Sequence, residues 1–513
     1  MNQKLSNSII YNVYPTSFYD SDGDGIGDLK GITEKLSYIK QFADIVWINP
    51  IYKSPFRDGG YDVQDYYAID EKFGTMDDLR ELIQKAHELD LKILLDLVVG
   101  HTSDQHKWFL ESSKAEENEY SDYYIWNDDV FRECDYKHIS GNSERNGNYL
   151  VNFFCFQPSL NFGFAKKTKA WQNLYTDEVC LKMHQRVIDI IKFYLAMGVD
   201  GFRVDLAGSI VKDDEDGKYS CEVWRKIFGE VRKEYPEAIF VSEWGQPMCA
   251  VPNGDYDIDF LTHCFDEGYN YLFRREPGTN AILDEGDSFF RKEGKGQADV
   301  FFKYFLSNLE AVKDKGYISV VTGNHDLPRL ALGRTQEELK TAMAFILGLP
   351  CVPLIYYGDE IGMPYSKLKT KDGGYVRTGS RTPMQWSDEK NAGFSVGDNE
   401  LYLPVNENYT EVNVKNQEQD AKSLMNTVRE LVEVKRKYAG LFACGNEFEL
   451  ISDTYPIVYK RTNEQGTLIC AVNPSNREYE VDISTGEVLS SSNAVVEDHK
   501  IILKPISYMW MKL

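Results

Sequence analysis

Gly201-Phe-Arg-Val-Asp205 is an apolar run, rich in β-forming residues, that ends in a carboxylate. The same pattern recurs in Ile239-Phe-Val-Ser-Glu-Trp244 and, after another such run, in Gly323-Asn-His-Asp-Leu-Pro-Arg329. Their acids are Asp205, Glu243 and Asp326, separated by 38 and then 83 residues. One strand-plus-helix unit of a (β/α)₈ barrel takes roughly 30 residues or more. The intervals therefore fit one and two units, which predicts that all three acids lie on the C-terminal rim of one barrel.

Strand-like and helix-like patterns alternate over most of the chain. Eight runs predict strands, at Ile9–Pro15, Asp44–Pro50, Lys92–Val99, Gly198–Leu206, Ala238–Trp244, Leu261–Phe265, Tyr317–Thr322 and Val352–Tyr357. Helical periodicity between them is clearest at Met76–Leu89, Glu178–Met197 and Lys340–Leu347. Such alternation is typical of α/β proteins with a parallel sheet, and eight units favour closure into a TIM barrel.

Two segments do not fit this alternation. Asp96 and Asp205 are 109 residues apart, and most of the excess lies between His101 and Phe162. That stretch is polar and aromatic, so we interpret 101–162 as a small domain inserted after the third strand. After Lys437 the pattern changes to short alternating runs, at Phe448–Ile451, Ile457–Arg461, Thr467–Val472, Tyr479–Ile483, Ile501–Leu503 and Tyr508–Met511. These predict a C-terminal antiparallel β-sandwich at 438–513, which leaves 1–100 and 163–437 for the barrel.

Composition excludes some classes of partner. The 513 residues carry a net charge of −24, which argues against nucleic acid and against anionic membrane surfaces. No apolar run reaches the roughly 18 residues of a membrane span. Aromatic residues make up 13% of the chain, which suits stacking on sugar rings as well as ordinary core packing.

Cysteine usage and the N-terminal sequence indicate a compartment. The nine cysteines, at 134, 155, 180, 221, 249, 264, 351, 444 and 470, are odd in number and form no CxxC pair. This pattern is typical of reduced thiols rather than of a disulfide frame or zinc site. The N-terminal residues lack the features of a signal peptide. We therefore expect a cytoplasmic protein.

Each acid has a chemical interpretation beside a structural one. Arg203 and Asp205 lie two apart on one strand, so their side chains point to the same side, and the guanidinium favours the ionised form of a nucleophilic carboxylate. A structural ion pair is the alternative. Glu243 follows an apolar run, and desolvation would raise its pKa as a general acid requires, unless it simply faces solvent. Asp326 beside His325 suits binding of sugar hydroxyls, although it could also cap a turn before Pro328.

A cluster of acids at the rim, without a nucleophilic Ser or Cys motif, points to glycosidic-bond chemistry. A second acidic segment, Asp20-Ser-Asp-Gly-Asp-Gly-Ile-Gly-Asp28, begins like an EF-hand loop. Its twelfth position is Gly31, so it is no EF-hand, but it could wrap a hard cation. The predicted ligands are Asp20, Asp22, Asp24, the Ile26 carbonyl and Asp28. A flexible, carboxylate-rich site favours Ca²⁺ over the alternative, Mg²⁺, and a plain acidic turn is the structural alternative.

Together these motifs resemble glycoside hydrolase family 13, the α-amylase family, and in particular its oligo-1,6-glucosidase/α-glucosidase branch. The likeness runs nearly from end to end. It rests on the three acid motifs and on Ile10–Phe18, Asp58–Asp62, Asp96–His101, Gln157–Asn161, Tyr356–Met363, Arg381–Trp386, Asn391–Phe394 and Leu403–Asn406.

The resemblance implies a catalytic barrel (domain A), an inserted domain B and a C-terminal β-sandwich (domain C). It also implies retaining hydrolysis of α-glucosidic bonds through a covalent intermediate. Asp205 would be the nucleophile, Glu243 the acid and base, and Asp326 the third acid that binds ring hydroxyls. Positions matching the glucose pocket are Asp58, Tyr61, His101, Arg203, His325 and Arg329, with Tyr61 as the stacking platform. In a retaining enzyme the Asp205 and Glu243 carboxyl groups lie about 5–5.5 Å apart.

The branch also suggests specificity. Gln157–Asn161 and Arg381–Trp386 look like those of exo-acting enzymes that remove one glucose from short oligosaccharides. Leu206, after the nucleophile, favours α-1,6 over α-1,4 linkages. Four positions depart from the family pattern and suggest a divergent branch: Gly59, Gly100, Ser159 and Ser242. Gly100 stands in place of Asn, which weakens the expectation of a second cation site.

The leading hypothesis is an α-glucosidase acting on small oligosaccharides, as a monomer or weak homo-oligomer. A transglucosylase or isomerase of the trehalose-synthase kind, or a hydrolase specific for sucrose or another small glucoside, is the alternative on the same scaffold. A non-catalytic binding subunit is disfavoured, because such relatives typically lose the acids that this chain keeps.

Overall fold

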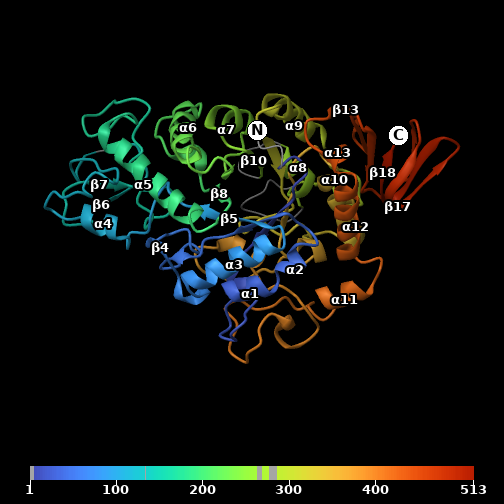
Figure 1. Cartoon of the computed structure of the whole chain (residues 1–513), viewed down its shortest axis with the longest axis horizontal. Coiled ribbons are helices and arrows are strands. Elements are labelled where there is room, and N and C mark those ends of the chain that lie inside the picture. The colour runs from blue at the N-terminus through green and yellow to red at the C-terminus, as the bar shows by residue number, and fades with distance from the viewer. Residues whose placement is uncertain (1–4, 133, 263–267, 277–285) are drawn as a thin grey trace.

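The computed structural model describes residues 5–132, 134–262, 268–276 and 286–513. Its centre is a parallel sheet of eight strands in the order β11-β10-β9-β8-β5-β2-β1-β12 (Figure 1). The strands are β1 (Ile10–Val13), β2 (Ile45–Ile48), β5 (Lys92–Leu97), β8 (Gly201–Val204), β9 (Ile239–Ser242), β10 (Ile258–Leu261), β11 (Tyr317–Val320) and β12 (Leu354–Tyr356). The Thr322 amide donates to the Leu354 carbonyl at 2.9 Å, which joins the two ends and closes the predicted TIM barrel.

The strands are short, apolar and buried on both faces, as a parallel barrel requires. Helices cover the outside: α1 (Leu29–Glu34), α2 (Leu36–Ile39), α3 (Met76–Glu88), α5 (Glu178–Leu195), α6 (Lys218–Arg232), α7 (Pro247–Gly254), α8 (Tyr269–Phe273), α9 (Asp299–Val312) and α10 (Gln336–Gly348). The Thr75 hydroxyl accepts from the Asp78 amide, and the Asp78 carboxylate accepts from the Thr75 amide, so a capping box starts α3. Thr335 and Glu338 start α10 in the same way.

The sixth strand lies elsewhere than the sequence predicts. The expected strand at Leu261–Phe265 is replaced by β10 at Ile258–Leu261, and 263–265 lie outside the described residues. The reason is that Asp257 and Asp259 interrupt the apolar pattern, yet both are accommodated. Ser242 donates to the buried Asp259 carboxylate at 2.6 Å from the neighbouring strand, and Arg232 pairs with Asp257 at 2.9 Å.

The segment between β5 and α5 projects from one side of the barrel (Figure 1). It contains α4 (Lys107–Ser112) and an antiparallel pair, β6 (His138–Ser140) with β7 (Asn148–Leu150). A second small pair, β3 (Tyr52–Lys53) with β4 (Asp65–Ile69), follows β2. Short 3₁₀ helices lie at η2 (Pro15–Ser17), η3 (Glu71–Phe73), η4 (Ala207–Ser209), η5 (Asp359–Ile361), η6 (Tyr375–Ser380) and η7 (Lys390–Gly393). The domain limits at 101–162 and 438–513 stay predictions.

The C-terminal region, which follows α11 (Val414–Gln419), α12 (Leu424–Lys437) and α13 (Ala439–Phe442), is one curled antiparallel sheet. Its strands are β13 (Glu447–Asp453), β14 (Ile457–Asn463), β15 (Gly466–Asn473), β16 (Tyr479–Asp482), β17 (Glu487–Glu497) and β18 (Lys500–Lys512). The two predicted runs at 501–503 and 508–511 are halves of the single strand β18. Pairing explains the continuity, because β18 bonds β15 and β16 along one edge and β17 along the other. The sequence pattern missed β17, whose serine-rich alternation is weak.

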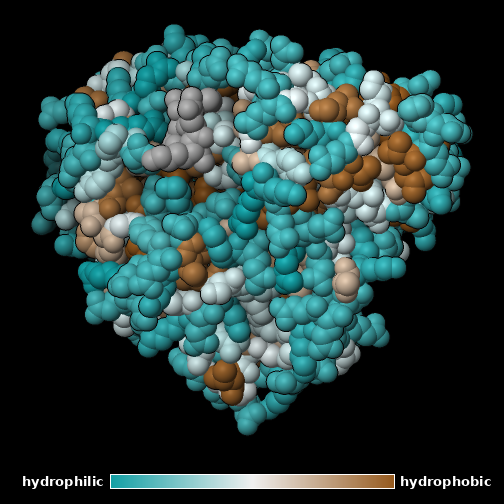
Figure 2. Space-filling model, turned by 45° about the vertical axis from the view of Figure 1, so that its right-hand side comes forward, coloured by the Kyte–Doolittle hydropathy of each residue, from teal (hydrophilic) through white to brown (hydrophobic). Residues whose placement is uncertain are grey.

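This sheet docks on the barrel through α10 and α12, which lie between the two in Figure 1. The buried Arg461 guanidinium crosses the junction and donates to the carbonyls of Gly348 and Phe442 at 2.8 and 2.6 Å. The face in Figure 2 is mostly hydrophilic with scattered apolar patches. Among the described residues no helix is both long and apolar enough to cross a membrane. The eight described cysteines are free thiols, and Cys264 lies outside the described residues.

Glu360, in η5 behind β12, is a buried acid that ties the barrel wall to α2. Its Oε1 accepts from the hydroxyls of Tyr11 and Tyr38, each at 2.7 Å. Burial raises the pKa of Glu360 to about 7 from an ordinary 4.5, against the lowering effect of the two tyrosines. The folded protein therefore holds this proton more tightly than the unfolded chain does.

We predict that the stability of Glu360→Gln relative to the unchanged protein increases as the pH rises from about 5 to 7.5. A raised folded pKa gives stability that is present below pH 4.5 and lost as the pH rises through about 7. The glutamine loses nothing over this range because it does not ionise. The difference should approach about 3 kcal/mol at most, measured by denaturant unfolding at both pH values. A difference in unfolding free energy that does not change with pH would contradict this.

Candidate active site

The register of neighbouring strands gathers the acids. Asp96 on β5 pairs with Arg203 on β8, and Arg203 pairs with Val241 on β9. Asp205 and Glu243 are the first residues beyond Val204 and Ser242, so both emerge at the C-terminal ends of adjacent strands. The three predicted acids all line one cavity at this rim, which confirms that they are brought together.

One guanidinium holds three carboxyl groups. Arg203 is buried, and its Nη1 donates to Asp96 at 2.5 Å and to Asp205 at 2.9 Å. Its Nη2 lies 2.6 Å from the Glu243 carboxyl group. The other Glu243 oxygen accepts from the Leu206 amide at 3.1 Å, and Leu206 adopts a left-handed backbone conformation with φ 44°. Both sides of the Glu243 carboxyl group are therefore fixed.

Burial dominates the ionisation of these groups. It raises the pKa of both Asp205 and Glu243 to about 7, although Arg203 lowers each of them. Burial also raises the pKa of Asp96 to about 6. Ionising all three carboxyl groups around one cation in a buried site would cost much free energy. The three groups together therefore keep one proton near neutral pH. The site can thus offer a carboxylate and a carboxylic acid at once.

Two arginines bind Asp326. Arg377 Nη1 lies 2.7 Å from its carboxylate and Arg381 Nη2 lies 3.2 Å from the same oxygen. Arg377 Nη2 also reaches Asp58 at 3.2 Å, where Gln157 donates to the other Asp58 oxygen at 2.7 Å. Burial raises the pKa of Asp58 to about 7, against these partners. Arg377 therefore ties the third acid to Asp58 across the cavity.

Tyr61 and two neutral histidines form part of the cavity wall. The Tyr61 ring stacks on His325 with centroids 4.9 Å apart and planes at 8°. His101 Nε2 lies 2.9 Å from the Tyr61 carbonyl, and burial lowers the pKa of His101 to about 4. Burial also lowers the pKa of His325 well below its ordinary value. Neutral imidazoles can hydrogen bond to hydroxyl groups without adding charge.

The cavity has a volume of about 560 Å³, which fits a ligand of a few rings. The polar groups described above form part of its wall. The rest is formed mostly by apolar and aromatic side chains, and two of these stack on each other: Phe154 and Tyr375 have centroids 6.0 Å apart. The lining includes Asp58, Tyr61, His101, Phe153, Phe154, Asp205, Leu206, Gly208, Ser209, Glu243, Trp244, His325, Asp326, Tyr375, Val376 and Arg377.

Among the residues predicted for catalysis and the glucose pocket, Arg203 and Arg329 do not line the cavity. Arg203 lies directly beneath it, in contact with the acids. Arg329 is buried farther away, donates to the Tyr357 carbonyl at 2.6 Å and lies 3.5 Å from Asp359. The place expected for Arg329 is taken by Arg377. Arg377 lies four residues before the Arg381–Trp386 motif, and this chain position is the one sequence signal that could have indicated Arg377 as a site residue.

The departures from the family pattern have local partners. Ser242 donates to Asp259, and Ser159 donates to Asn152 at 2.7 Å. A side chain at Gly100 would meet the Asn152 amide at 2.7 Å. Gly59 has φ 58° and lies against Tyr14 and Arg381, where a side chain would be crowded.

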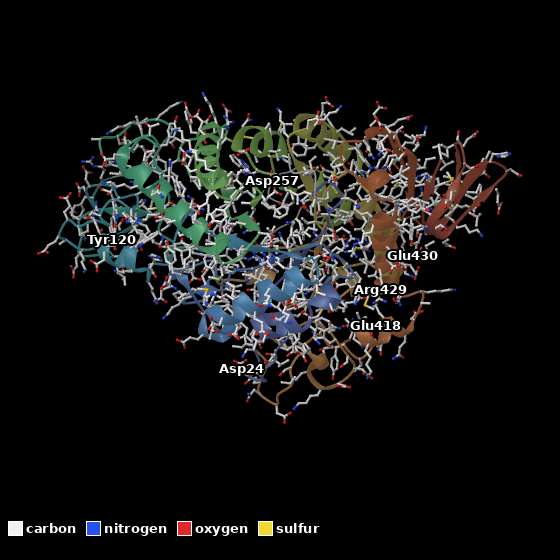
Figure 3. All side chains as sticks on the ribbon, viewed as in Figure 1. Asp24, Tyr120, Asp257, Glu418, Arg429 and Glu430 are labelled. Carbon is white, nitrogen blue, oxygen red and sulfur yellow. The ribbon has the colours of Figure 1, made fainter. Side chains whose placement is uncertain are left out.

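The acidic loop lies apart from this cavity. One carboxylate oxygen from each of Asp20, Asp22 and Asp28 falls within 4.8 Å of the others, a spacing that could hold a metal ion. Asp24, at the lower edge of Figure 3, is not in this group; its carboxylate accepts from the Ile26 amide at 2.7 Å. Burial, and then the charge of Asp22, raise the pKa of Asp28, so a cation would relieve repulsion. Three of the five predicted ligands therefore fit a hard cation.

Comparison with known proteins agrees with this geometry. Residues 12–443 match the family model described as alpha amylase, catalytic domain. An oligo-1,6-glucosidase of Parageobacillus thermoglucosidasius is 32% identical over 535 aligned residues, covering 92% of this chain and 90% of the relative. An alpha-glucosidase of Apis mellifera is also 32% identical, covering 93% and 86%.

Among solved structures, the trehalulose synthase of Pseudomonas mesoacidophila MX-45 is similar, with a TM-score of 0.83 and 25% identity. The match covers 99% of both chains. It extends from the barrel through the C-terminal sheet.

We predict a bell-shaped dependence of kcat/KM on pH with both limbs near neutrality. The rate should rise with pH as Asp205 ionises and fall as Glu243 loses its proton, because burial raises both pKa values to about 7. Because Asp205 and Glu243 interact, the two limbs give apparent pKa values of the pair and not of either residue alone.

The Glu243→Gln variant assigns the limbs. With an aryl α-glucoside, whose leaving group needs little protonation, kcat/KM of this variant should keep the acid limb and lose the alkaline one. An alkaline limb that persists in the variant would refute the role of Glu243 as the proton donor.

Proposed function

The chain belongs to the α-amylase family as a glycoside hydrolase of the oligo-1,6-glucosidase/α-glucosidase type, and we propose that it removes terminal α-linked glucose from short oligosaccharides with retention of configuration. The observation that carries this proposal is the Arg203 fork between Asp205 and Glu243. One planar guanidinium bonds both carboxyl groups, which supports the short separation of about 5–5.5 Å that retaining enzymes use.

In the first step the Asp205 carboxylate attacks the anomeric carbon. Glu243 gives its proton to the glycosidic oxygen, so the bond to the leaving sugar breaks as the bond to Asp205 forms. The raised pKa of Glu243 keeps that proton available near pH 7. Arg203 then balances the charge that Glu243 acquires.

In the second step Glu243, now ionised, takes a proton from water. The resulting hydroxide attacks the glucosyl–Asp205 ester and releases glucose with the original configuration. The Leu206 amide, 3.1 Å from Glu243, supports the ionised form by hydrogen bonding.

The polar end of the cavity suits one glucose ring. Asp326, Asp58 and Arg377 form a bridged set of charged groups that can bind several ring hydroxyls. Tyr61, packed on His325, gives a fixed aromatic face for the ring. The resemblance of Gln157–Asn161 and Arg381–Trp386 to those of exo-acting enzymes supports exo action, in which the terminal residue enters first.

Linkage preference is a finer part of the proposal. Leu206 lines the cavity beside the nucleophile. The resemblance implies that a bulky aliphatic residue at this position accompanies α-1,6 specificity, so Leu206 favours α-1,6 over α-1,4 bonds. The similar trehalulose synthase supports a second candidate, a transglucosylase or isomerase. The apolar wall at Trp244, Phe153 and Phe154 gives that candidate its physical basis, because it would keep water from the intermediate.

We also propose that the acidic loop binds Ca²⁺ through Asp20, Asp22 and Asp28. The ion would be structural, because none of these residues lines the catalytic cavity. The Asp20 amide donates to the Phe394 carbonyl and the Asn399 amide group to the Gly23 carbonyl, so the ion would fasten two distant segments.

The free cysteines support a cytoplasmic location, and a monomer or weak homo-oligomer stays the expected state.

We predict that the protein releases free glucose from isomaltose faster than from maltose, with little product from sucrose or trehalose. The measurement is separate incubation with each sugar and resolution of the products. Formation of a new disaccharide with little free glucose would contradict hydrolysis and would indicate an isomerase or transglucosylase.

Asp205→Asn is the control for the same assay. It keeps the size of the side chain and should lower kcat by about three orders of magnitude or more, because the nucleophile is lost. Its thermal unfolding should show a folded protein. A variant that stays active on isomaltose would refute the assignment of Asp205.

We predict that a calcium chelator lowers the melting temperature by a few degrees, roughly 2–4 °C, because a bound ion stabilises only the folded state. Below the melting range kcat should be unchanged. Asp22→Asn should lose most of the shift, whereas Asp498→Asn, an exposed change on the C-terminal sheet, should keep it. No shift with chelator in the unchanged protein would count against the site.

A further inference from the structure

Two cysteines on neighbouring helices lie in direct contact. Cys221 is near the start of α6 and Cys249 near the start of α7, and these two helices pack side by side (Figure 1). Their sulfur atoms are 3.6 Å apart. Among the cysteines that the structure describes, no other pair of sulfur atoms is in hydrogen-bonding contact. The mechanism proposed above uses neither thiol.

The two thiols differ in accessibility and acidity. Cys221 is buried, whereas Cys249 is partly exposed to solvent. The hydrogen bond between them lowers the pKa of Cys249 and raises that of Cys221. The thiolate is the form of cysteine that attacks a disulfide, and it must also be accessible. Cys249 therefore suits the attacking thiol, and Cys221 suits the second thiol that resolves the mixed disulfide.

The pair is linked to the wall of the catalytic cavity through Gly217. The Cys221 amide donates to the Gly217 carbonyl at 3.0 Å. A side chain at Gly217 would clash with the Trp244 ring and would lie 3.3 Å from the Cys249 sulfur, so the Gly217 backbone packs closely against both. Trp244 lines the cavity and directly follows Glu243. A shift of α6 toward α7 would therefore press on the residue beside the proposed acid.

We propose that Cys221 and Cys249 form a thiol–disulfide exchange site for small, low-molecular-weight disulfides, and that the bond between the two cysteines slows hydrolysis by displacing Trp244. The effect on hydrolysis rests on the proposed function, whereas the exchange itself does not. In a reducing compartment such protein disulfides are usually transient and respond to oxidants. The pair would thus make turnover depend on the redox state of the surroundings.

The exchange has two steps, with the small disulfide as the oxidant. The Cys249 thiolate attacks one sulfur of the small disulfide, which forms a mixed disulfide and releases one small thiolate that takes up a proton. Cys221 then loses its proton and attacks the Cys249 sulfur, which releases the second small thiol. The protein dithiol gives up two electrons and two protons, and the small disulfide receives them as it becomes two thiols.

Formation of the bond must move the protein. A covalent sulfur–sulfur bond is much shorter than the present contact, so the starts of α6 and α7 are drawn together. Because Gly217 already packs closely against the Trp244 ring, the movement passes to Trp244 and to the adjacent Glu243. A displacement of about 1 Å can lower a rate by up to about a hundredfold. We therefore expect a loss of about tenfold in kcat/KM.

The first test detects the bond. The purified protein is incubated with glutathione disulfide, the remaining thiols are alkylated, and the peptides are identified by mass spectrometry. We expect a Cys221–Cys249 disulfide that dithiothreitol removes. Cys221→Ser should stop at a mixed disulfide on Cys249, and Cys249→Ser should leave Cys221 as a free thiol. Absence of the Cys221–Cys249 bond, under conditions that modify the exposed Cys155, would overturn the inference.

The second test measures activity in a Cys155→Ser background, because Cys155 is exposed in the inserted segment and would also take up glutathione. With the best substrate of the reduced enzyme, kcat/KM should fall about tenfold on oxidation and recover with dithiothreitol. Addition of Cys221→Ser and Cys249→Ser should abolish the fall. A fall that persists in this triple variant, or a bond that forms without any change in kcat/KM, would overturn the link to Trp244.

The two tests separate this inference from the function on which its second half rests. Mass spectrometry detects the disulfide without any substrate. If the reduced enzyme released no glucose from any oligosaccharide, the proposed function would be refuted, and the mass spectrum would still decide whether the exchange site exists.

Discussion

The Arg203 guanidinium is the constraint on which the site depends. It is buried at the end of β8 and bonds carboxyl groups from β5, β8 and β9 at once, namely Asp96, Asp205 and Glu243. A single positive charge among three acids fixes their positions and leaves one proton to share. The parallel barrel makes this arrangement available, because the register places Asp96, Arg203 and Val241 side by side on three strands.

Around this centre the loops divide the cleft by chemistry. Arg377 joins Asp58 to Asp326, and in the proposed function these fixed charges and hydrogen-bonding groups hold the glucose ring. On the other side the inserted segment contributes Phe153 and Phe154, and Tyr375, 58% exposed, stacks on Phe154 from the opposite loop. The barrel therefore holds the proposed reacting groups, whereas the segments inserted between its elements form the rest of the cavity wall.

Much of this follows from the sequence because the signals are local. An apolar run that ends in an acid predicts both a strand and a rim position, as Asp205 and Glu243 demonstrate. Arg377 was not predictable in this way, since its role depends on how the long segment after β12 folds back over the cavity. Arg329 was placed in the pocket for the same reason, because its true position depends on contacts distant in the sequence. The strand β17 was missed because its pairing with β18, and not its own sequence pattern, makes it a strand.

The configuration of the first product tests the central claim most directly. Proton NMR during the first minutes of hydrolysis distinguishes the two anomers of glucose before they interconvert. Two displacements at one carbon, by Asp205 and then by water, predict that α-glucose appears first. Initial formation of β-glucose would mean a single displacement by water, and would contradict the assignment of Asp205 as a nucleophile held beside Glu243 by Arg203.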